Sequence, residues 1–523
     1  MGVPLAATAE PLAAAVVGPA GQQTAGRHRP WWVWAGPFVL VLTVLVVRSR
    51  FLFTARIYEQ GDAAANSILV EQAKHFTLLV GNYSRERFNH PGPAYMYVQA
   101  LGEWLLADLL HLVPTAWNAH VLAIFALNSA FVAMMVAVVY GWTRSLRGAV
   151  VCLAVVLACV ATEPWILSYD WMPWMYVPAY VAFAIAAGSV AAGGERDLWI
   201  LTLTGWFLIH GHVCFLFFVP VIVAAAAAAV MWRYGPRAAL RRFARARTWV
   251  PVTVISAVFA LPIAVNLALH WPGDFGMYLS YSSSKNAGGH GVSQVLHYAL
   301  WYWWQRGGGW AAWLVPAVSY LVAVAVVRLS RSPVRRFLVA LLAINIVSTL
   351  AFLCYTAVGV DVLSERYIGF FYFSAPLITL LVIAVSLTEG LPLGALAAPV
   401  LAVLAVIAFA AAPATAVNTG DTDAALPGAV TAVAASAHGK TIVIYFDHNA
   451  WPDVTGFLVQ AERTGVRACV RSPWWRFMMT SQFICTPAQI FTGAPFWFNG
   501  PAAPHTVHVI ATLKNSEITA GAA

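Results

Sequence analysis

The segment 58–97, YEQGDAAANSILVEQAKHFTLLVGNYSRERFNHPGPAYMY, is far more polar than the apolar segments on either side of it. Only 10% of the chain is charged, yet this segment contains Glu59, Asp62, Glu71, Lys74, Arg85, Glu86, Arg87 and His90. An acid near its start and a basic group near its end are suited to acid–base chemistry on a phosphorylated substrate. We therefore expect the functional site here, held at the lipid surface by the rest of the chain.

The composition is that of a membrane protein. The 523 residues are 61% hydrophobic, and the mean hydropathy is +0.73. Apolar runs of about 20 residues, the length that crosses a bilayer as a helix, recur along the chain. The net charge of +9 does not indicate a nucleic-acid partner, because the arginines lie in short loops between apolar runs. Cytoplasmic loops of membrane proteins are enriched in Lys and Arg in this way.

We predict an all-α polytopic membrane protein with about eleven transmembrane helices, in a transmembrane domain that covers 31–413. Residues 1–30 are expected to form a disordered cytoplasmic tail. The spans are expected at 31–50, 119–142, 148–168, 176–193, 198–210, 213–232, 249–270, 310–329, 337–360, 367–388 and 391–413. Arginines in the loops place the N-terminus in the cytoplasm, although Arg48, Arg50 and Arg56 oppose this orientation. An odd number of spans then places the C-terminus outside.

Two helices in the first outer loop, 52–118, are expected to lie at the membrane surface. If residues 62–80 form a helix, one of its faces is mostly apolar and consists of Ile68, Leu69, Gln72, Phe76 and Leu79. Residues 93–112 are apolar but are interrupted by Gly102, Glu103 and Asp108. If 93–112 crossed the membrane, Arg144 and Arg147 would lie outside and every later loop would be inverted.

The C-terminal region, 414–523, is expected to be a small extracytoplasmic α/β domain. It contains candidate strands at 441–446, 466–470 and 506–512 and a candidate helix at 453–464. It has no glycine fingerprint for phosphate binding, so a nucleotide domain is not indicated. Cys469 and Cys485 are the cysteines of this region and become disulfide candidates if it is outside the cytoplasm. The remaining cysteines lie in apolar runs, where they are expected to pack as small hydrophobic side chains: Cys152, Cys159, Cys214 and Cys354.

Asp62 is the candidate catalytic base. It follows Gly61 at the start of the expected helix 62–80, where the helix N-terminus favours a carboxylate. The alternative is that Asp62 only caps the helix. As a base next to the bilayer it would deprotonate an acceptor hydroxyl. Asn66, one turn later, can share that face as a hydrogen-bond donor.

Arg85, Arg87 and His90 are candidate substrate-binding residues. The planar guanidinium of Arg suits phosphate oxygens. Each of these residues can alternatively extend toward lipid headgroups. The sequence Asn89-His90-Pro91-Gly92-Pro93 also signals a turn that redirects the chain.

Two further candidates lie in outer connections. Asp170 lies between Tyr169 and Trp171 at the outer end of a span, where acids are costly and tend to be paired or functional. Arg366 belongs to a short outer loop that also contains Asp361. The pair His210 and His212 is weak evidence for a metal site, and the same holds for His290 and His297.

Together these features resemble the GT-C superfamily of integral membrane glycosyltransferases. The most similar members are lipid A aminoarabinose transferases, protein O-mannosyltransferases and related actinobacterial envelope enzymes. The resemblance lies in Gly61-Asp62-Ala63, in Leu79-Val80-Gly81-Asn82-Tyr83-Ser84-Arg85, in 89–93 and in Asp170. It implies a lipid-linked sugar donor and a first-loop Asp, here Asp62, as catalytic base. His90 stands where many members have a phosphate-binding Lys, and Ala63 follows Asp62 where a paired-acid metal site needs a second acid.

The sequence thus predicts transfer of a sugar from a polyprenyl-phosphate donor to an envelope glycan, lipid or protein on the extracytoplasmic side. Arg85, Arg87, His90 and Arg366 would neutralise the leaving phosphate, and Asp170 would bind substrate. No nucleotide cofactor is expected, because nucleotide sugars are confined to the cytoplasm; a divalent metal is left open. The alternatives are a transporter or lipid-linked sugar flippase, which favours ionisable residues midway through spans, and a non-catalytic envelope assembly protein.

Overall fold

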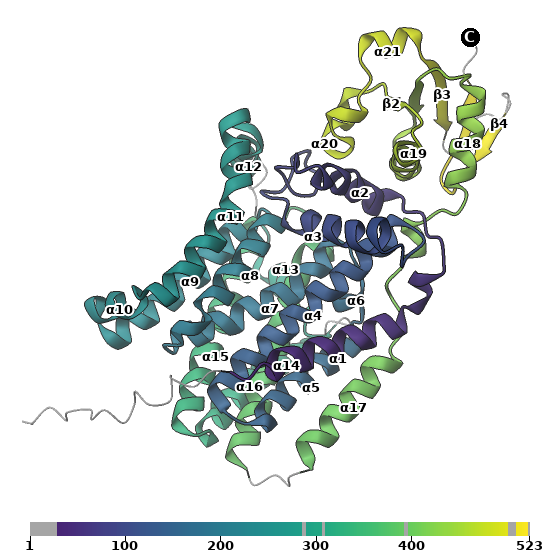
Figure 1. The fold of residues 1–523 in the computed structure, drawn as a ribbon. Coiled ribbons are helices and arrows are strands. Elements are labelled where there is room, and N and C mark those ends of the chain that lie inside the picture. Colours follow the sequence, from purple (N-terminus) through teal and green to yellow (C-terminus); the bar gives the residue numbers. More distant parts are fainter. Residues whose placement is uncertain (1–28, 285–288, 306–308, 392–395, 500–508, 521–523) are drawn as a thin grey trace, which may run out of the picture.

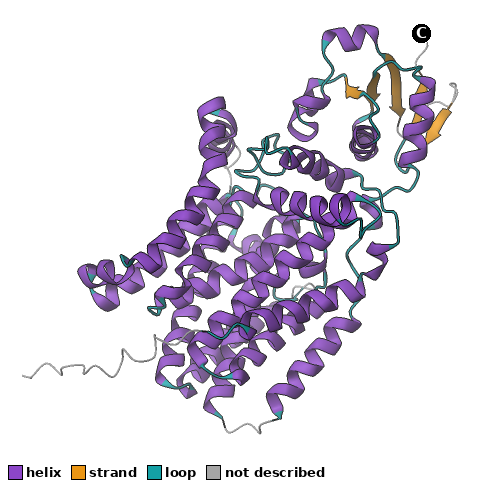
Figure 2. Ribbon diagram, in the orientation of Figure 1, coloured by secondary structure: helices purple, strands orange, loops and turns teal. Residues whose placement is uncertain are grey.

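The computed structural model describes residues 29–284, 289–305, 309–391, 396–499 and 509–520. A bundle of helices makes up most of the molecule, and a small domain stands on one end of it (Figure 1). All strands belong to that small domain (Figure 2). The predicted tail 1–30 falls almost entirely outside the described residues.

Seven helices of the described chain are long and apolar enough to cross a membrane. They are α4 (Ala116–Thr143), α7 (Met172–Ala191), α9 (Phe215–Tyr234), α11 (Ala246–His270), α14 (Leu314–Val326) with its flanking turns, α15 (Ser332–Val358) and α16 (Ser374–Gly390) with the turn before it. The chain is therefore an α-helical polytopic membrane protein, as its composition predicts.

The expected count of about eleven spans is not confirmed. The spans expected at 31–50, 148–168, 198–210 and 391–413 correspond to shorter helices of 17, 17, 14 and 15 residues. These are α1 (Trp32–Arg48), α5 (Leu146–Thr162), α8 (Leu198–Gly211) and α17 (Ala397–Ala411). With 17 residues, α1 and α5 reach the lower end of the length that crosses a bilayer, about 17–25 residues, whereas α8 and α17 are shorter.

The outer surface of the bundle is apolar along several helices. On α11 the exposed side chains include Val254, Val258 and Leu261, and α17 exposes Leu401 and Leu404. Large exposed apolar surfaces on a helical bundle indicate contact with lipid. Cys354 on α15 belongs to this exposed surface, contrary to the expectation that it packs inside, whereas the other three unpaired cysteines are buried.

Arginine-bearing connections gather at the end of the bundle opposite the small domain. Arg29 contacts Asp197, in the turn between α7 and α8, at 2.6 Å. Arg242, on α10 (Pro236–Phe243), forms an ion pair with Glu195 in the same turn. Figure 1 shows α10 far from the small domain. Arg29 and Arg242 thus both pair with the turn between α7 and α8.

Helix α2 (Gly61–Lys74) lies between the bundle and the small domain. Ala64, Ala65 and Ile68 belong to the apolar core of the small domain, whereas Leu69 and Val70 belong to that of the bundle. The expected surface helix 62–80 is therefore wrong in two respects. It ends at Lys74, so the exposed Phe76 lies beyond it, and protein covers both of its apolar faces.

Polar contacts also fix α2 to the small domain. The hydroxyl of Thr455 donates to the carbonyl of Gly61 at 3.3 Å. Just before α2, the fully buried Glu59 accepts from Arg463 at 2.8 Å. Both Thr455 and Arg463 belong to α19 (Trp451–Arg463).

Helix α3 (Ala94–Glu103) continues into a π-helical turn, Trp104–Leu109. Leu101, Trp104 and Leu109 are more than half exposed. An exposed apolar face of this kind agrees with the expected placement of 93–112 at the membrane surface.

The expected long loop 271–309 contains two helices, α12 (Gly273–Ser284) and α13 (Val292–Trp301). Short helix α6 (Trp165–Ser168) precedes α7. These segments lie at the end of the bundle that faces the small domain (Figure 1).

The small domain has a five-stranded sheet in the order β2-β1-β3-β5-β4. Its strands are β1 (Ile442–Phe446), β2 (Ala468–Val470), β3 (Ala494–Asn499), β4 (Val509–Thr512) and β5 (Glu517–Ala520). The first three are parallel and the last two join antiparallel. The sequence did not indicate β3 or β5, and residues 506–508 of the strand expected at 506–512 lie outside the described residues.

The helices of the small domain are α18 (Leu426–Ser436), α19, α20 (Arg476–Met479) and α21 (Pro487–Thr492). A disulfide joins Cys469 to Cys485, with Cα atoms 5.0 Å apart. It closes the segment that contains Trp474, Trp475 and α20. That segment faces the bundle and contributes to the cavity described next.

Candidate functional site

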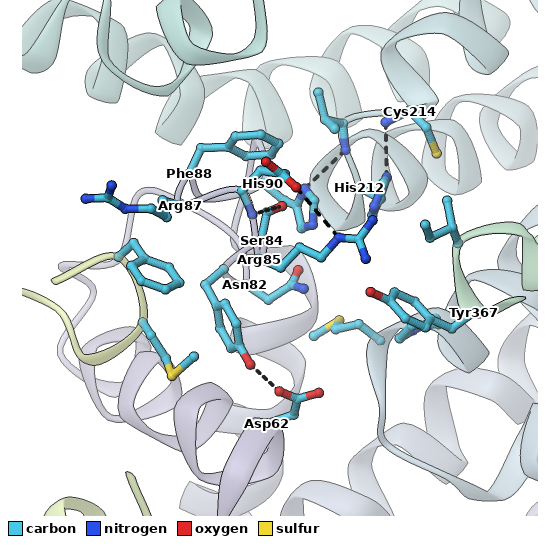
Figure 3. A pocket seen from close by; sticks show the side chains of 18 of the residues that line it. Asp62, Asn82, Ser84, Arg85, Arg87, Phe88, His90, His212, Cys214 and Tyr367 are labelled. Carbon is cyan, nitrogen blue, oxygen red and sulfur yellow. Dashed lines mark hydrogen bonds and ion pairs between the residues drawn. The ribbon is translucent and has the colours of Figure 1, made fainter. Parts of the chain in front are cut away.

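A cavity of about 600 Å³ lies where the first loop, the bundle and the small domain meet. It is lined by five of the seven predicted catalytic and substrate-binding residues, Asp62, Asn66, Arg85, Arg87 and His90, and also by His212. Figure 3 shows several of them around the cavity. The bundle and the small domain contribute mostly aromatic side chains, including Trp171, Tyr176, Tyr367, Trp451, Trp474 and Trp475.

Asp62 lies in the first turn of α2, one residue after Gly61, whose φ of +59° is in the left-handed region that favours glycine. The Tyr83 hydroxyl donates a hydrogen bond to Asp62 Oδ1 (Figure 3). Trp171 Nε1 donates to Asp62 Oδ2 at 2.9 Å. The N-cap of α2 is Gln60. Asp62 is therefore not the N-cap residue, and its carboxylate is held at the cavity by a tyrosine and a tryptophan.

Burial and the nearby charge of Asp62 raise the pKa of Tyr83 well above its ordinary value. The phenol therefore stays protonated and continues to donate to Asp62 at any physiological pH. Because each carboxylate oxygen has two lone pairs, one donor on each leaves both oxygens able to accept another hydrogen.

A backbone hairpin presents Tyr83, Arg85 and Arg87 to the cavity. The amide of His90 donates to the carbonyl of Asn82 at 2.9 Å. At the tip of the hairpin, the backbone amide of Arg87 donates to the carbonyl of Ser84 at 2.9 Å. Arg87 has a φ of +69°, which is unusual for a residue with a side chain. Helix α12 holds the hairpin from outside, because the amide of Asn89 donates to Asp274 at 3.1 Å.

The two arginines of the hairpin differ in their partners. Arg85 forms an ion pair with Asp361 and lies 3.8 Å from the carboxylate of Glu86. The guanidinium of Arg87 lies 3.6 Å from the ring centre of Trp474, a cation–π contact with the small domain. Within the described residues Arg87 has no carboxylate partner. The lining thus combines these two arginines with three carboxylates, those of Asp62, Glu86 and Asp361.

His90 is 3% exposed and packs against His212, with ring centres 4.2 Å apart. Burial, and secondarily the neighbouring His212, lowers the pKa of His90 well below its ordinary value. Burial lowers the pKa of His212 to about 4. Both rings are therefore neutral at neutral pH, so His90 does not supply the positive charge that was expected of it.

The histidines considered for a metal do not form a metal site in the described chain. His210 Nδ1 accepts from the amide of Ala94 at 3.3 Å, and its Nε2 lies 2.9 Å from the carbonyl of Phe259. A Cβ at Gly92 would lie 2.3 Å from the His210 ring, so only glycine permits this approach. His290 Nε2 lies 2.7 Å from the carbonyl of Val360, and His297 is on an exposed face of α13. The described residues include no group of three or more His, Cys, Asp or Glu side chains placed to hold a metal ion.

Two predicted substrate-binding residues do not line this cavity. Asp170 is 5% exposed and is not among the lining residues. Burial, with the charge of Asp421 next in size, raises the pKa of Asp170 to about 8. Arg366 points to the ring of Tyr298, whose centre is 4.9 Å from the guanidinium carbon. Its neighbour Tyr367 lines the cavity instead.

Sequence reasoning missed most of the aromatic lining. In the sequence Trp171 is noticed only as a neighbour of Asp170. In the structure its Nε1 donates a hydrogen bond to Asp62. Trp474 and Trp475 follow Pro473 in the small domain. Two adjacent tryptophans in a polar region are the sequence feature that could have indicated a binding surface there. No sequence feature indicates that Tyr83 donates a hydrogen bond to Asp62, because this contact depends on how the hairpin folds onto α2.

Comparison with protein-family models and with curated proteins finds no match to this chain. The site must therefore be interpreted from its own geometry. It offers a fixed carboxylate, two guanidinium groups, neutral imidazoles and flat aromatic walls. These groups can accept a proton from a hydroxyl, contact an anion and pack against the faces of a ring-shaped ligand.

Proposed function

We propose that the protein is a membrane glycosyltransferase of the GT-C type. It would transfer a sugar from a polyprenyl-phosphate donor to a glycan, lipid or protein of the cell envelope. The observation that carries this proposal is the Asp62 carboxylate, oriented by Tyr83 and Trp171, in an aromatic cavity that also contains Arg85 and Arg87. The resemblance of the first loop to the superfamily supports the same conclusion.

In this mechanism Asp62 accepts the proton of the acceptor hydroxyl as that oxygen attacks the anomeric carbon of the donor sugar. The bond between the anomeric carbon and the phosphate oxygen breaks, and the leaving lipid phosphate takes the electron pair. General-base catalysis of this kind typically contributes about 10²–10⁴-fold in rate. The hydrogen bonds from Tyr83 and Trp171 orient the carboxylate, and the guanidinium groups stabilise the charge that develops on the phosphate.

The distribution of charge supports a cavity on the extracytoplasmic side. Arg29 and Arg242 meet at the turn between α7 and α8, away from the cavity, and arginine-bearing connections are enriched in the cytoplasm. A lipid-linked donor suits an outward-facing site, because nucleotide sugars remain in the cytoplasm. The exposed apolar surfaces of the bundle allow the prenyl chain to stay in the bilayer while its phosphate enters the cavity.

The test uses purified protein in lipid nanodiscs with polyprenyl-monophosphate sugars that differ in the sugar. An envelope extract serves as acceptor, and release of polyprenyl phosphate is measured. We expect release with at least one donor and its loss in Asp62→Asn. Asp108→Asn is the matched control, because Asp108 lies outside the cavity and contacts Lys74 at 2.9 Å.

The proposal fails if no donor is consumed, or if Asp62→Asn retains the wild-type rate. Movement of a fluorescent lipid-linked sugar across proteoliposomes, without transfer, would indicate a flippase instead.

A further inference from the structure

His90 and His212 lie side by side at the wall of the cavity. His90 ends the hairpin, and His212 lies in the turn between α8 and α9. Both rings line the cavity, 4.2 Å apart. Arg85 already contacts Asp361, and Arg87 already contacts Trp474. The N–H groups of the two imidazoles are the next hydrogen-bond donors at the cavity to consider.

Backbone contacts determine where each ring carries its hydrogen. The amide of Val213 donates to His90 Nδ1 at 3.3 Å. The amide of Cys214 donates to His212 Nδ1 at 3.1 Å. An amide N–H can only donate, so each Nδ1 must present a lone pair. Each neutral ring therefore carries its hydrogen on Nε2. Figure 3 shows both of these bonds.

The Nε2 atoms are free of protein partners in the part of the chain that the structure describes. A neutral ring with hydrogen on Nε2 offers no lone pair there, so this edge of the ring cannot bind a metal ion without losing that hydrogen. It can donate a hydrogen bond to an oxygen atom. Two such donors from adjacent rings, tilted by 36° to each other, suit a group with several acceptor oxygens.

The start of α9 reinforces these donors. Val213 and Cys214 immediately precede this 20-residue helix, and the N-terminus of a helix carries partial positive charge. Their amides polarise the imidazoles through the bonds to Nδ1, because hydrogen bonds in a chain strengthen one another. A neutral imidazole held at a helix N-terminus is an effective donor to an oxyanion.

We propose that His90 and His212 form a neutral two-donor site for the non-bridging oxygens of a phosphate group. The assignment of this phosphate to a lipid-linked donor rests on the proposed function. Arg85 contacts Asp361 and Arg87 contacts Trp474 in this structure, and their part remains to stabilise the charge that develops on the phosphate during transfer.

Binding is measured with undecaprenyl monophosphate, with inorganic phosphate and with undecaprenol, on the full-length protein in detergent. His212→Phe retains a flat ring but has no donor, and we expect the dissociation constant for the lipid phosphate to rise about 10- to 100-fold, the value of one hydrogen bond to a charged group. His212→Gln is the matched variant, because its amide can place a donor near the position of Nε2. We expect it to restore most of the affinity.

The ligands distinguish the source of the phosphate. Displacement of the lipid phosphate by millimolar inorganic phosphate identifies a site for phosphate itself. A lack of displacement identifies a site that also needs the prenyl chain. Equal binding of undecaprenol and its phosphate would overturn the proposal, as would unchanged affinity in His212→Phe.

A second measurement reads the position of the ring hydrogen in the wild-type protein itself. Nitrogen-15 NMR of histidine-labelled wild-type protein, assigned by comparison with His212→Gln, reports which ring nitrogen carries hydrogen. We expect an Nε2–H signal that shifts when the lipid phosphate binds. An Nδ1–H or doubly protonated ring at neutral pH would refute the proposal.

Failure of this proposal and failure of the proposed function give different results. If the lipid phosphate binds through the histidines but no donor transfers its sugar, the site stands and the enzyme assignment fails. If transfer occurs and His212→Phe binds the lipid phosphate normally, the enzyme stands and the histidine site fails.

Discussion

Helices α2 and α3 are adjacent in the chain, and the sequence predicts for both a place at the membrane surface. The structure covers α2 with protein on two sides, by the bundle and by the small domain. It leaves the apolar face of α3 and its π-helical turn open, with Leu101 60% exposed. The apolar pattern indicates which side chains avoid water, but it does not indicate whether protein or lipid receives them.

The difference also concerns function. The helix that protein covers contributes the candidate base to the cavity, whereas the open helix contributes no residue to its lining. A catalytic side chain must be held in a fixed geometry by packed neighbours. Lipid contact supplies no such fixed geometry.

The largest effect is expected from Asp62 on the covered helix. Asp62→Asn retains one oxygen for Tyr83 or Trp171 but loses the capacity to take a proton, so transfer should fall by about 10²–10⁴-fold. The measurement is the rate of polyprenyl phosphate release in nanodiscs. Asp108→Asn, near the end of the open helix, should stay close to the wild-type rate. Equal losses in both variants would remove the functional contrast between α2 and α3.

The next effect concerns stability. Ile68 is 1% exposed in the core of the small domain, so Ile68→Ala should destabilise the protein by about 2–5 kcal/mol. Leu101→Ala on the open face should change stability by about 0.5 kcal/mol or less. Apparent melting temperatures in one detergent compare the two. A larger loss for Leu101→Ala would show that protein rather than lipid covers α3.

A pH-dependent effect on stability is expected from Asp170, next to Trp171 in the chain. The folded pKa of Asp170 is about 8, and that of an unfolded Asp is about 3.9. Between these values the folded state holds a proton that the unfolded state has released, so wild-type stability falls as pH rises. Asp170→Asn removes this dependence.

The advantage of Asp170→Asn should therefore grow from pH 5 to pH 8, by at most about 1.4 kcal/mol for each pH unit. Thermal unfolding at pH 5, 6.5 and 8 measures it. An advantage that is greater at pH 5 than at pH 8 would contradict the burial of a protonated carboxyl.

The smallest effect involves no loss of activity or stability. A spin label at Leu105→Cys, on the open π-helical turn, should be more accessible to oxygen than to a water-soluble nickel complex, because lipid faces it. A label at Phe491→Cys, on the distal α21 and 91% exposed, should show the reverse. Cys354→Ser is needed as background, because Cys354 is exposed. Identical accessibility at both sites would place α3 in water.

The sequence predicts those features that depend on local pattern. Long apolar runs predict α4, α7, α9 and α15, and the strand expected at 441–446 agrees with β1. The sequence selects Asp62 as a candidate because an acid follows Gly61 at the start of an expected helix, and its role as a base stays a prediction. A segment as short as β5 gives too little pattern to separate a strand from a loop.

Features that depend on distant contacts could not be predicted. Arg85 pairs with Asp361, 276 residues away, and Asp62 bonds to Trp171, 109 residues away. Arg366 and Tyr367 are neighbours in the chain, yet only Tyr367 faces the cavity, because the turn that contains them directs adjacent side chains to different surroundings. The tertiary fold settles which residue of such a pair reaches the site.

The position of α2 has a consequence for how the protein is made. Glu59, just before α2, and Arg463, on α19, are 404 residues apart in the chain. At a synthesis rate of about 5–20 residues per second, α2 leaves the ribosome about 20–80 s before its partner helix exists. During that interval Ala64, Ala65 and Ile68 have no covering surface. The nascent chain must therefore shelter this helix in the lipid surface or with a chaperone until its last hundred residues arrive.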